Sequence, residues 1–214
     1  MSTAVLARPD RQVRTIIAEP ITYRVLEPAG DSTPLLLGYW HGLFRWTGAV
    51  LGPEGFLASD FEVGSASAIQ KSLRGLIERR LGVCRSASQD RPPTESARQF
   101  DVLHFALETL ALGHREEFDD IPLDYSLGTP FQQQVWRELR KIRWGETVSY
   151  GELAARIGNP KASRAVGSAN GANVLAPIVP CHRVLAGGNR LGGYGGGLPL
   201  KRRLLQLEGV EVDA

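Results

Sequence analysis

One stretch of the chain places a nucleophile beside a base. Cys181 is followed directly by His182 and preceded by Pro180, and Arg183 and Val184 come next. A cysteine reacts as the thiolate, and its ordinary pKa of about 8.5 leaves it mostly protonated at neutral pH, so a neighbouring imidazole can help by accepting the proton. Pro180 restricts its own φ and holds the cysteine on a defined bend. These residue types suit a reactive thiol, and they suit a buried structural cysteine equally well.

The composition indicates the kind of protein in which such a thiol would lie. Of the 214 residues, 43% are hydrophobic, which is enough for one large or two small folded domains. Two cysteines do not make a disulfide framework, and this indicates a reducing compartment. The N-terminus lacks the apolar segment of a signal peptide or membrane anchor. We therefore expect a cytoplasmic protein, or a nuclear one in a eukaryote, with no membrane partner.

Charge is distributed unevenly along the chain. The net charge is only +2, yet residues 129–214 carry 12 Lys and Arg against 6 Asp and Glu, whereas residues 1–128 carry 13 against 17. The C-terminal part is therefore the part expected to meet a polyanion such as nucleic acid. A basic surface without a partner is the alternative interpretation.

Residues 21–127 are predicted to form a small α+β domain after a polar lead-in, residues 1–20. Short apolar runs separated by Gly and Pro predict strands, and apolar residues at steps of three and four predict helices. The predicted strands are residues 21–26, 34–40, 43–51, 56–61 and 117–125, and the predicted helices are residues 65–81 and 97–112. The polar segment 86–96, which contains two prolines, is predicted to be a surface loop.

Residues 128–214 are predicted to form a mainly helical domain. Its helices are expected at residues 129–142, 149–157, 161–170 and 198–208, with Ser149 and Glu152 at the spacing of a capping box. Two short helices joined by a glycine-containing turn indicate a helix-turn-helix. One face of residues 161–170 carries small side chains, which permits close approach to a narrow groove and equally permits tight helix packing. In the last helix, Lys201, Arg202 and Arg203 are expected to be exposed.

The stretch Val179-Pro180-Cys181-His182-Arg183-Val184 resembles the active-site motif of the O6-alkylguanine-DNA alkyltransferases, the methylated-DNA–protein-cysteine methyltransferases. The resemblance extends over roughly residues 128–209. It implies an α+β fold, in which a small ribonuclease H-like N-terminal domain precedes a winged-helix-like C-terminal domain. It also implies an activity: irreversible, stoichiometric transfer of the alkyl group from O6-alkylguanine in duplex DNA to Cys181, without a cofactor. O4-alkylthymine is a second candidate substrate. The expected partner is double-stranded DNA, bound by a monomer, with cooperative binding along DNA left open.

The resemblance also implies roles for individual residues. His182 would act on the thiol through a water molecule and be oriented by Glu208, and Asn173 would brace the turn before the active-site strand. The alkylated base would be bound by Tyr150, Val184, Tyr194 and Gly195. Reaching O6 inside a duplex requires the base to be flipped out, and Arg164 would then fill the gap while Tyr150 pushes on the phosphate. The remaining implied DNA contacts are Gly151, Gln132, Asn159, Ala162 and Gly187.

Three alternatives can be stated from the residues. A structural zinc would need Cys84 with His41, His104 or His114, and their spacing is not that of a metal site, so no metal is expected. Cys84 is interpreted as a small packing residue. A module that binds the lesion without repairing it would lack the cysteine. A cysteine peptidase normally has its Cys and His far apart in sequence.

Overall fold

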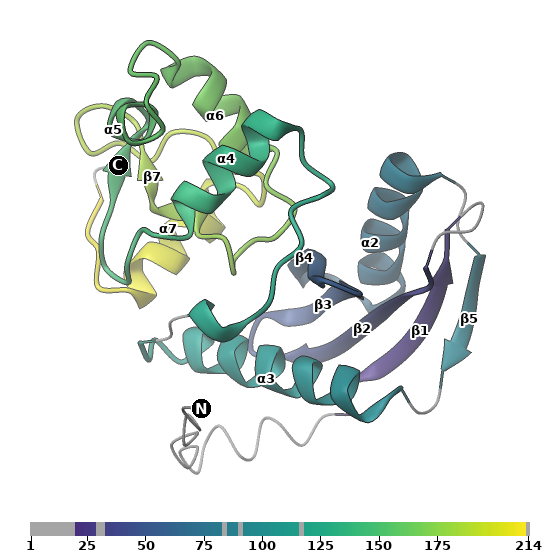
Figure 1. Ribbon diagram of the computed structural model, residues 1–214. Helices are drawn as coiled ribbons and strands as arrows, with labels where there is room; N and C mark the ends of the chain where they lie inside the picture. Colours follow the sequence, from purple (N-terminus) through teal and green to yellow (C-terminus); the bar gives the residue numbers. More distant parts are fainter. Residues whose placement is uncertain (1–19, 29–32, 83–84, 90–91, 116–117, 213–214) are drawn as a thin grey trace, which may run out of the picture.

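Four of the five strands predicted in the N-terminal part, together with one strand that was not predicted, pair into one antiparallel sheet (Figure 1). The computed structural model describes residues 20–28, 33–82, 85–89, 92–115 and 118–212, so the predicted lead-in lies outside the described residues except for its last residue. The sheet has five strands in the order β4-β3-β2-β1-β5. These strands are β1 (Thr22–Glu27), β2 (Leu35–Gly42), β3 (Arg45–Gly52), β4 (Gly55–Val63) and β5 (Arg85–Gln89).

Two helices, α2 (Ala66–Leu81) and α3 (Thr94–Ala111), cover opposite faces of this sheet. A Cβ on Gly38 would lie 2.5 Å from the ring of Phe100 in α3, and a Cβ on Gly48 would lie 3.1 Å from Ile69 in α2. The two glycines occupy neighbouring cross-strand pairs, with Ala49 and Tyr39 respectively, so they face opposite sides of the sheet. Glycine at each position therefore lets one helix approach the strands closely.

Two predictions for the N-terminal part are wrong. Residues 86–96 are not a loop throughout, because β5 pairs with β1 at the edge of the sheet and α3 begins at Thr94. β5 is short and polar, so no apolar alternation marks it, and its backbone hydrogen bonds hold it in place. The strand predicted at residues 117–125 is instead a 3-10 turn, Phe118–Asp120, followed by one bridge between Leu123 and Phe56. Pro122 lacks the N–H that a longer ladder would need.

The C-terminal part is mainly helical, as predicted. Its helices are α4 (Pro130–Leu139), α5 (Tyr150–Arg156), α6 (Ser163–Gly171) and α7 (Leu198–Leu207), and two short parallel strands, β6 (Val148–Ser149) and β7 (Val184–Leu185), pair among them. The predicted capping box of Ser149 and Glu152 is confirmed at the start of α5. A second capping box, Thr129 with Gln132, starts α4. The Trp136 indole donates to the Ala169 carbonyl at 2.8 Å, and this bond ties α4 to α6.

The two parts meet along the outer edge of β4 (Figure 1). Ser59 donates its backbone N–H to the Val174 carbonyl and its hydroxyl to the Ala176 carbonyl, each at 2.8 Å. Glu62 forms an ion pair with Arg203 of α7. An edge strand exposes unpaired backbone groups, and these contacts cover part of that edge with the C-terminal chain. Most buried apolar side chains of the two parts form one continuous core, and Leu185, Leu191 and Leu205 form a small second cluster.

Two further expectations concern membrane-spanning helices and the fold class. In the described ranges, none of the helices combines the length and apolar character that crossing a bilayer requires. The architecture is a mixed α/β one, and the finer names given to its two domains stay predictions.

Candidate active site

Cys181 lies at the start of a single 3-10 turn, Cys181–Arg183, that leads into β7. Cys181 is only 5% exposed, and its thiol forms no disulfide. Pro180 begins the turn with φ −82° and cannot donate a backbone hydrogen bond. The turn directs the next two side chains, His182 and Arg183, into the protein, where both are buried. Three consecutive polar side chains are therefore withdrawn from water, and each needs a partner.

A single carboxylate satisfies two of these side chains. Glu208 caps the end of α7 and is buried. One of its oxygens, Oε1, lies 2.8 Å from His182 Nε2. Both oxygens accept from the Arg183 guanidinium, at 2.9 Å from Nε to Oε2 and 2.9 Å from Nη2 to Oε1. Arg183 also donates to the Ile142 carbonyl. A forked guanidinium–carboxylate contact of this kind is among the stronger hydrogen-bonded pairs in proteins.

This arrangement decides the charge and tautomer of His182. Burial raises the pKa of Glu208, but His182 and Arg183 outweigh burial and hold that pKa below its usual value. Burial lowers the pKa of His182, and the bond to Glu208 opposes this only in part. The imidazole is therefore neutral near pH 7. An ionised carboxylate only accepts, so His182 Nε2 must carry the hydrogen. Nδ1 is left as the basic nitrogen, and it has no hydrogen-bond partner among the described groups.

The charge of a buried lysine, Lys201, affects the pKa of the Cys181 thiol. Burial raises the pKa of the Cys181 thiol, while a hydrogen bond from Asn173 and the charge of Lys201 act against this shift. The prediction that Lys201 is exposed is wrong: this side chain is 0% exposed. Its ammonium group donates to the carbonyls of Val184 (2.6 Å), Leu191 and Gly193 (3.4 Å). Lys201 lies on the side of α7 that faces the segment after β7, together with Leu204 and Leu205. Burial lowers the pKa of Lys201 to about 8.

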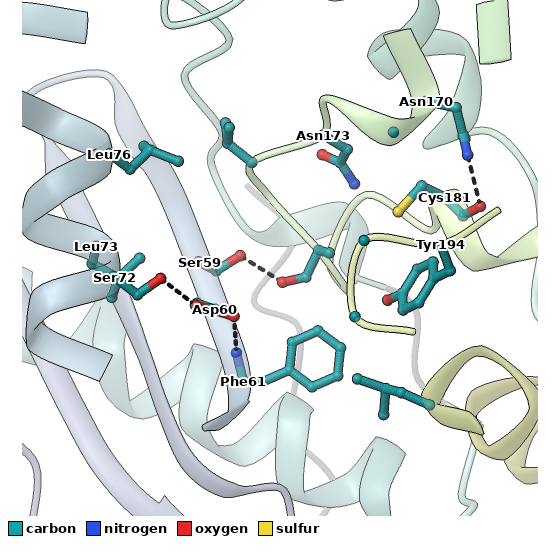
Figure 2. A pocket seen from close by; sticks show the side chains of 16 residues that line it. Ser59, Asp60, Phe61, Ser72, Leu73, Leu76, Asn170, Asn173, Cys181 and Tyr194 are labelled. Carbon is teal, nitrogen blue, oxygen red and sulfur yellow. Dashed lines mark hydrogen bonds between the residues drawn. The ribbon is translucent and has the colours of Figure 1, made fainter. Parts of the chain in front are cut away.

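Cys181 opens onto a cavity of about 230 Å³ between the two parts of the molecule (Figure 2). Four of the predicted site residues line it together: Asn173, Cys181, Tyr194 and Gly195. The Tyr194 hydroxyl is buried and has no partner among the described groups. Burial is the main cause that raises the pKa of Tyr194 well above its usual value, so the hydroxyl keeps its proton at neutral pH. The cavity therefore presents one thiol and one unpaired hydroxyl donor.

Two asparagines hold the backbone around the cysteine. Asn173 donates to the Val179 carbonyl at 2.8 Å and accepts from the Leu175 N–H at 3.0 Å. Asn170, at the end of α6, donates to the carbonyl of Cys181 itself at 3.3 Å. The segment that enters the 3-10 turn is thus tied to the end of α6, which fixes the position of Cys181 relative to that helix.

The other predicted site residues lie on the two sides of Cys181. Val184 is buried in β7, the next element along the chain. Tyr150 begins α5, and its ring lies between α6 and the loop at Gly192, where a Cβ would be 3.3 Å away. Burial first, and then the charge of Cys181, raise the pKa of Tyr150. Arg164 is exposed on α6. The other predicted DNA contacts are spread over the C-terminal part: Gln132 in α4, Gly151 in α5, Asn159 and Ala162 between α5 and α6, and Gly187 after β7. Of these, Gly151, Asn159 and Gly187 are exposed.

Comparison with known proteins connects this geometry to a family. Residues 130–210 match the family model described as the DNA-binding domain of 6-O-methylguanine DNA methyltransferase. A methylated-DNA–protein-cysteine methyltransferase of Haemophilus influenzae is 51% identical over 111 residues, which are 52% of this chain and 62% of that protein. A crystal structure of the Mycobacterium tuberculosis O6-methylguanine methyltransferase is 34% identical, with a TM-score of 0.55, over 88% of this chain and 93% of that one. The chain belongs to the methylated-DNA–protein-cysteine methyltransferase family.

A further structure shows a family member with its partner. The Mycobacterium tuberculosis protein in complex with DNA is 34% identical to this chain, with a TM-score of 0.56, and the match covers 79% of this chain and 90% of that one. The matched segment spans about three-fifths of the Haemophilus influenzae relative. The family is thus established over both parts of the fold, while the sequence similarity is concentrated in the C-terminal part.

Sequence reasoning missed several residues of this site. The motif contains Arg183 but does not indicate that this side chain pairs with Glu208. No pattern in the sequence indicates that Asn170 binds the Cys181 carbonyl. Lys201 was misplaced because a three-residue basic run normally marks an exposed helix face. Its position between Leu200 and Leu204, on the apolar side of α7, is the signal that could have revealed it.

The histidines that were candidate metal ligands lie in the described part of the chain, whereas the candidate Cys84 does not. Within the described ranges, no group of three or more His, Cys, Asp and Glu side chains has the arrangement of a metal site. His104 is instead buried against Trp40, with ring centroids 4.8 Å apart. Cys84 lies outside the described residues.

Proposed function

We propose that this protein repairs DNA by taking the alkyl group from O6-alkylguanine onto Cys181. The observation that carries the proposal is the network at the 3-10 turn: a buried free thiol beside a neutral imidazole whose Nε2 is committed to Glu208. That network leaves Nδ1 as a proton acceptor. Among the described residues that line the cavity, Cys181 supplies the only thiol, and the hydroxyls of Ser59 and Ser72 donate to the Ala176 carbonyl and to Asp60. Membership of the family supports the same reaction.

The chemistry follows from these groups. His182 Nδ1 takes the thiol proton, through a bound water molecule, and the Glu208 carboxylate stabilises the positive charge that forms on the imidazole. The thiolate sulfur then bonds to the alkyl carbon as the carbon–O6 bond breaks. The electron pair goes to the guanine, and the Tyr194 hydroxyl is positioned to donate a hydrogen bond to the departing base. A thioether is a poor leaving group, so Cys181 stays alkylated and the protein acts once.

The proposed DNA surface is the helix-turn-helix of α5 and α6. Its small side chains let α6 enter a minor groove about 6 Å wide. Arg164 is free to fill the gap left by a flipped base, and Tyr150 lies between that helix and Cys181. Gln132, Gly151, Asn159, Ala162 and Gly187 would add contacts to the backbone. We infer a monomer on duplex DNA, and O4-alkylthymine stays a second candidate substrate.

We also infer the finer domain names. The five-stranded sheet with a helix on each face supports a ribonuclease H-like N-terminal domain over residues 21–127. The helix pair followed by the short β6–β7 pairing supports a winged-helix-like C-terminal domain over residues 128–214.

The test is mass spectrometry of the protein after mixing with duplex DNA that contains O6-methylguanine. We expect one methylene unit of added mass per molecule, located on the peptide with Cys181, and no further repair when the DNA is in excess. Cys181→Ser should abolish transfer and keep DNA binding, whereas Cys84→Ala should leave transfer intact. Continued repair by one molecule, or transfer that survives Cys181→Ser, would contradict the proposal.

A further inference from the structure

The cavity at Cys181 is not built by the C-terminal part alone. One of its walls comes from the N-terminal part, from β4 and α2 (Figure 2). Phe61, Leu73 and Leu76 supply the apolar side of this wall, and Ser59, Asp60 and Ser72 supply the polar side. The hydrogen bonds of Ser59 to Val174 and Ala176 hold β4 against the opposite wall. The same cavity thus joins the reacting thiol to side chains more than a hundred positions earlier in the chain.

The N-terminal wall carries a charge. Of the described residues lining the cavity, Asp60 is the only Asp, Glu, Lys, Arg or His. Its carboxylate is fixed in place, because Oδ1 accepts from the Phe61 N–H at 2.9 Å and Oδ2 accepts from the Ser72 hydroxyl at 2.5 Å. Both donors are neutral, so they orient the carboxylate without cancelling its charge. The negative charge of Asp60 also contributes to raising the pKa of Tyr194, which indicates that its field reaches across the cavity.

The positive charges near Cys181 lie behind it. Lys201 and Arg183 are buried, and neither lines the cavity. The Lys201 ammonium is committed to backbone carbonyls, and Arg183 is committed to Glu208 and the Ile142 carbonyl. These cations act on the sulfur and the imidazole, whereas a group that enters the cavity meets Asp60.

We propose that this cavity is the subsite for the alkyl substituent of the lesion and that Asp60 makes it select against anionic substituents. The inference rests on the proposed alkyl transfer to Cys181. Bringing a substituent carboxylate beside the half-buried Asp60 is unfavourable, because two like charges at close range repel each other even where water partly screens them. Uncharged groups larger than methyl, such as carbamoylmethyl, avoid that repulsion. The N-terminal part thereby influences which lesions the C-terminal part repairs.

A pair of lesions that differ in charge and hardly in size tests this. Duplex DNA carries either O6-carboxymethylguanine or its neutral isostere O6-carbamoylmethylguanine, and single-turnover rates are measured for each. We expect the parent protein to prefer the neutral lesion by about tenfold or more. Asp60→Asn keeps a hydrogen-bonding side chain of the same shape, and it should reduce that preference by about tenfold. Glu54→Gln, an exposed change of equal charge in the β3–β4 turn, should leave the preference as in the parent.

A second measurement separates this proposal from the proposed repair function. Iodoacetamide and iodoacetate place the same two substituents on a thiol, with loss of iodide, and need no DNA. The ratio of their rates at Cys181, read by mass spectrometry of its peptide and divided by the ratio for 2-mercaptoethanol, should favour iodoacetamide in the parent and fall in Asp60→Asn. A ratio that matches 2-mercaptoethanol, or that Asp60→Asn leaves unchanged, would overturn the charge selection even if repair occurs. A selective ratio without methyl transfer from DNA would support the charge-selective cavity and reject the repair function.

Discussion

Around Cys181, burial and charge act in opposite directions on the thiol. Burial favours the protonated form, and the positive charge of Lys201 with a hydrogen bond from Asn173 favours the thiolate. Burial is the larger effect, because the net shift raises the pKa. A thiol in this state needs a base at the moment of reaction, and the neutral His182 provides one. Burial is the main cause that keeps the imidazole uncharged, and Arg183, which pairs with Glu208, adds to this effect.

The first prediction concerns the base. His182→Ala should slow methyl transfer at neutral pH by about a hundredfold, because the thiol then loses its proton only to solvent. The defect should shrink as the pH rises toward the raised pKa of Cys181, because hydroxide then supplies the thiolate directly. Single-turnover rates from neutral to alkaline pH measure this effect. Parallel pH profiles for parent and variant would remove His182 from the proton transfer.

The second prediction concerns Lys201. Lys201→Met should raise the pH at which Cys181 reacts with iodoacetamide, because a nearby positive charge is lost. The pKa of Lys201 is lowered to about 8, so its charge is present below that pH and disappears above it. The difference between parent and variant should therefore be largest below about pH 8 and diminish above it.

The same variant should also lower the free energy of unfolding. The three carbonyls that Lys201 joins lose their donor, and a buried unsatisfied group costs about 1–3 kcal/mol. Lys141→Met is the control, because that exposed lysine pairs with Glu138 on the surface. Chemical denaturation measures both variants. Equal alkylation profiles for parent and Lys201→Met would show that Lys201 only supports the loop.

At the scale of elements, α5 and α6 form a rigid pair with separate buried and exposed sides. Leu153 and Val166 are buried, while Arg164 and Ser168 are exposed. Asn170 at the end of α6 donates to the Cys181 carbonyl, and Asn173 just after α6 donates to the Val179 carbonyl, so side-chain hydrogen bonds connect the end of this helix to the segment of Cys181. The helix proposed to enter DNA, α6, is thus bonded to the segment of Cys181 at its end, whereas its exposed face does not contact Cys181.

The third prediction follows from that separation. Arg164→Ala should slow repair of O6-alkylguanine in duplex DNA by roughly ten- to a hundredfold, because filling the gap offsets part of the few kcal/mol of unstacking. Its reaction with free O6-benzylguanine should change little, since a free base needs no unstacking. Lys161→Ala removes an exposed charge just before α6, and it should weaken duplex binding without this selective loss. Equal losses on both substrates would mean that Arg164 supports the fold of the site.

At the scale of the whole molecule, the two parts share a core and a cavity. The segment at residues 174–176 pairs with the edge of β4, and Arg140 of the C-terminal part donates to the carbonyls of Phe118 and Ile121, each at 2.7 Å. These contacts between the two parts fix the position of the wall with Asp60 relative to Cys181. The parts should therefore unfold together.

The fourth prediction tests this coupling. Unfolding by denaturant should give coincident transitions by tryptophan fluorescence and by far-UV circular dichroism, as expected for a cooperative unit. Ser59→Ala should lower the unfolding free energy by about 1 kcal/mol, because the Ala176 carbonyl loses its donor. Ser67→Ala, on the exposed side of α2, should stay within about 0.5 kcal/mol of the parent. Two separate transitions would show that the parts fold independently.

Local sequence patterns predicted most of the elements and the proposed nucleophile. The caps, the apolar periodicity of α2 and α4, and the Pro-Cys-His stretch all act within a few residues of one another, so they are visible in the sequence. The failures share a cause. β5 is stabilised by backbone pairing with β1, which lies more than fifty positions earlier, and its own side chains carry no pattern.

Tertiary structure decided the charges and the walls of the site. Glu208 meets Arg183 across 25 positions, and burial of His182, with a smaller contribution from the Arg183 charge, makes the imidazole a neutral base. Lys201 is buried because the chain after β7 folds back over α7 and presents carbonyls to it. Asp60 lines the cavity because it lies on β4, the edge strand that faces the C-terminal part. Electrostatic energies depend on distance and on the exclusion of water, and neither can be read from the order of residues along the chain.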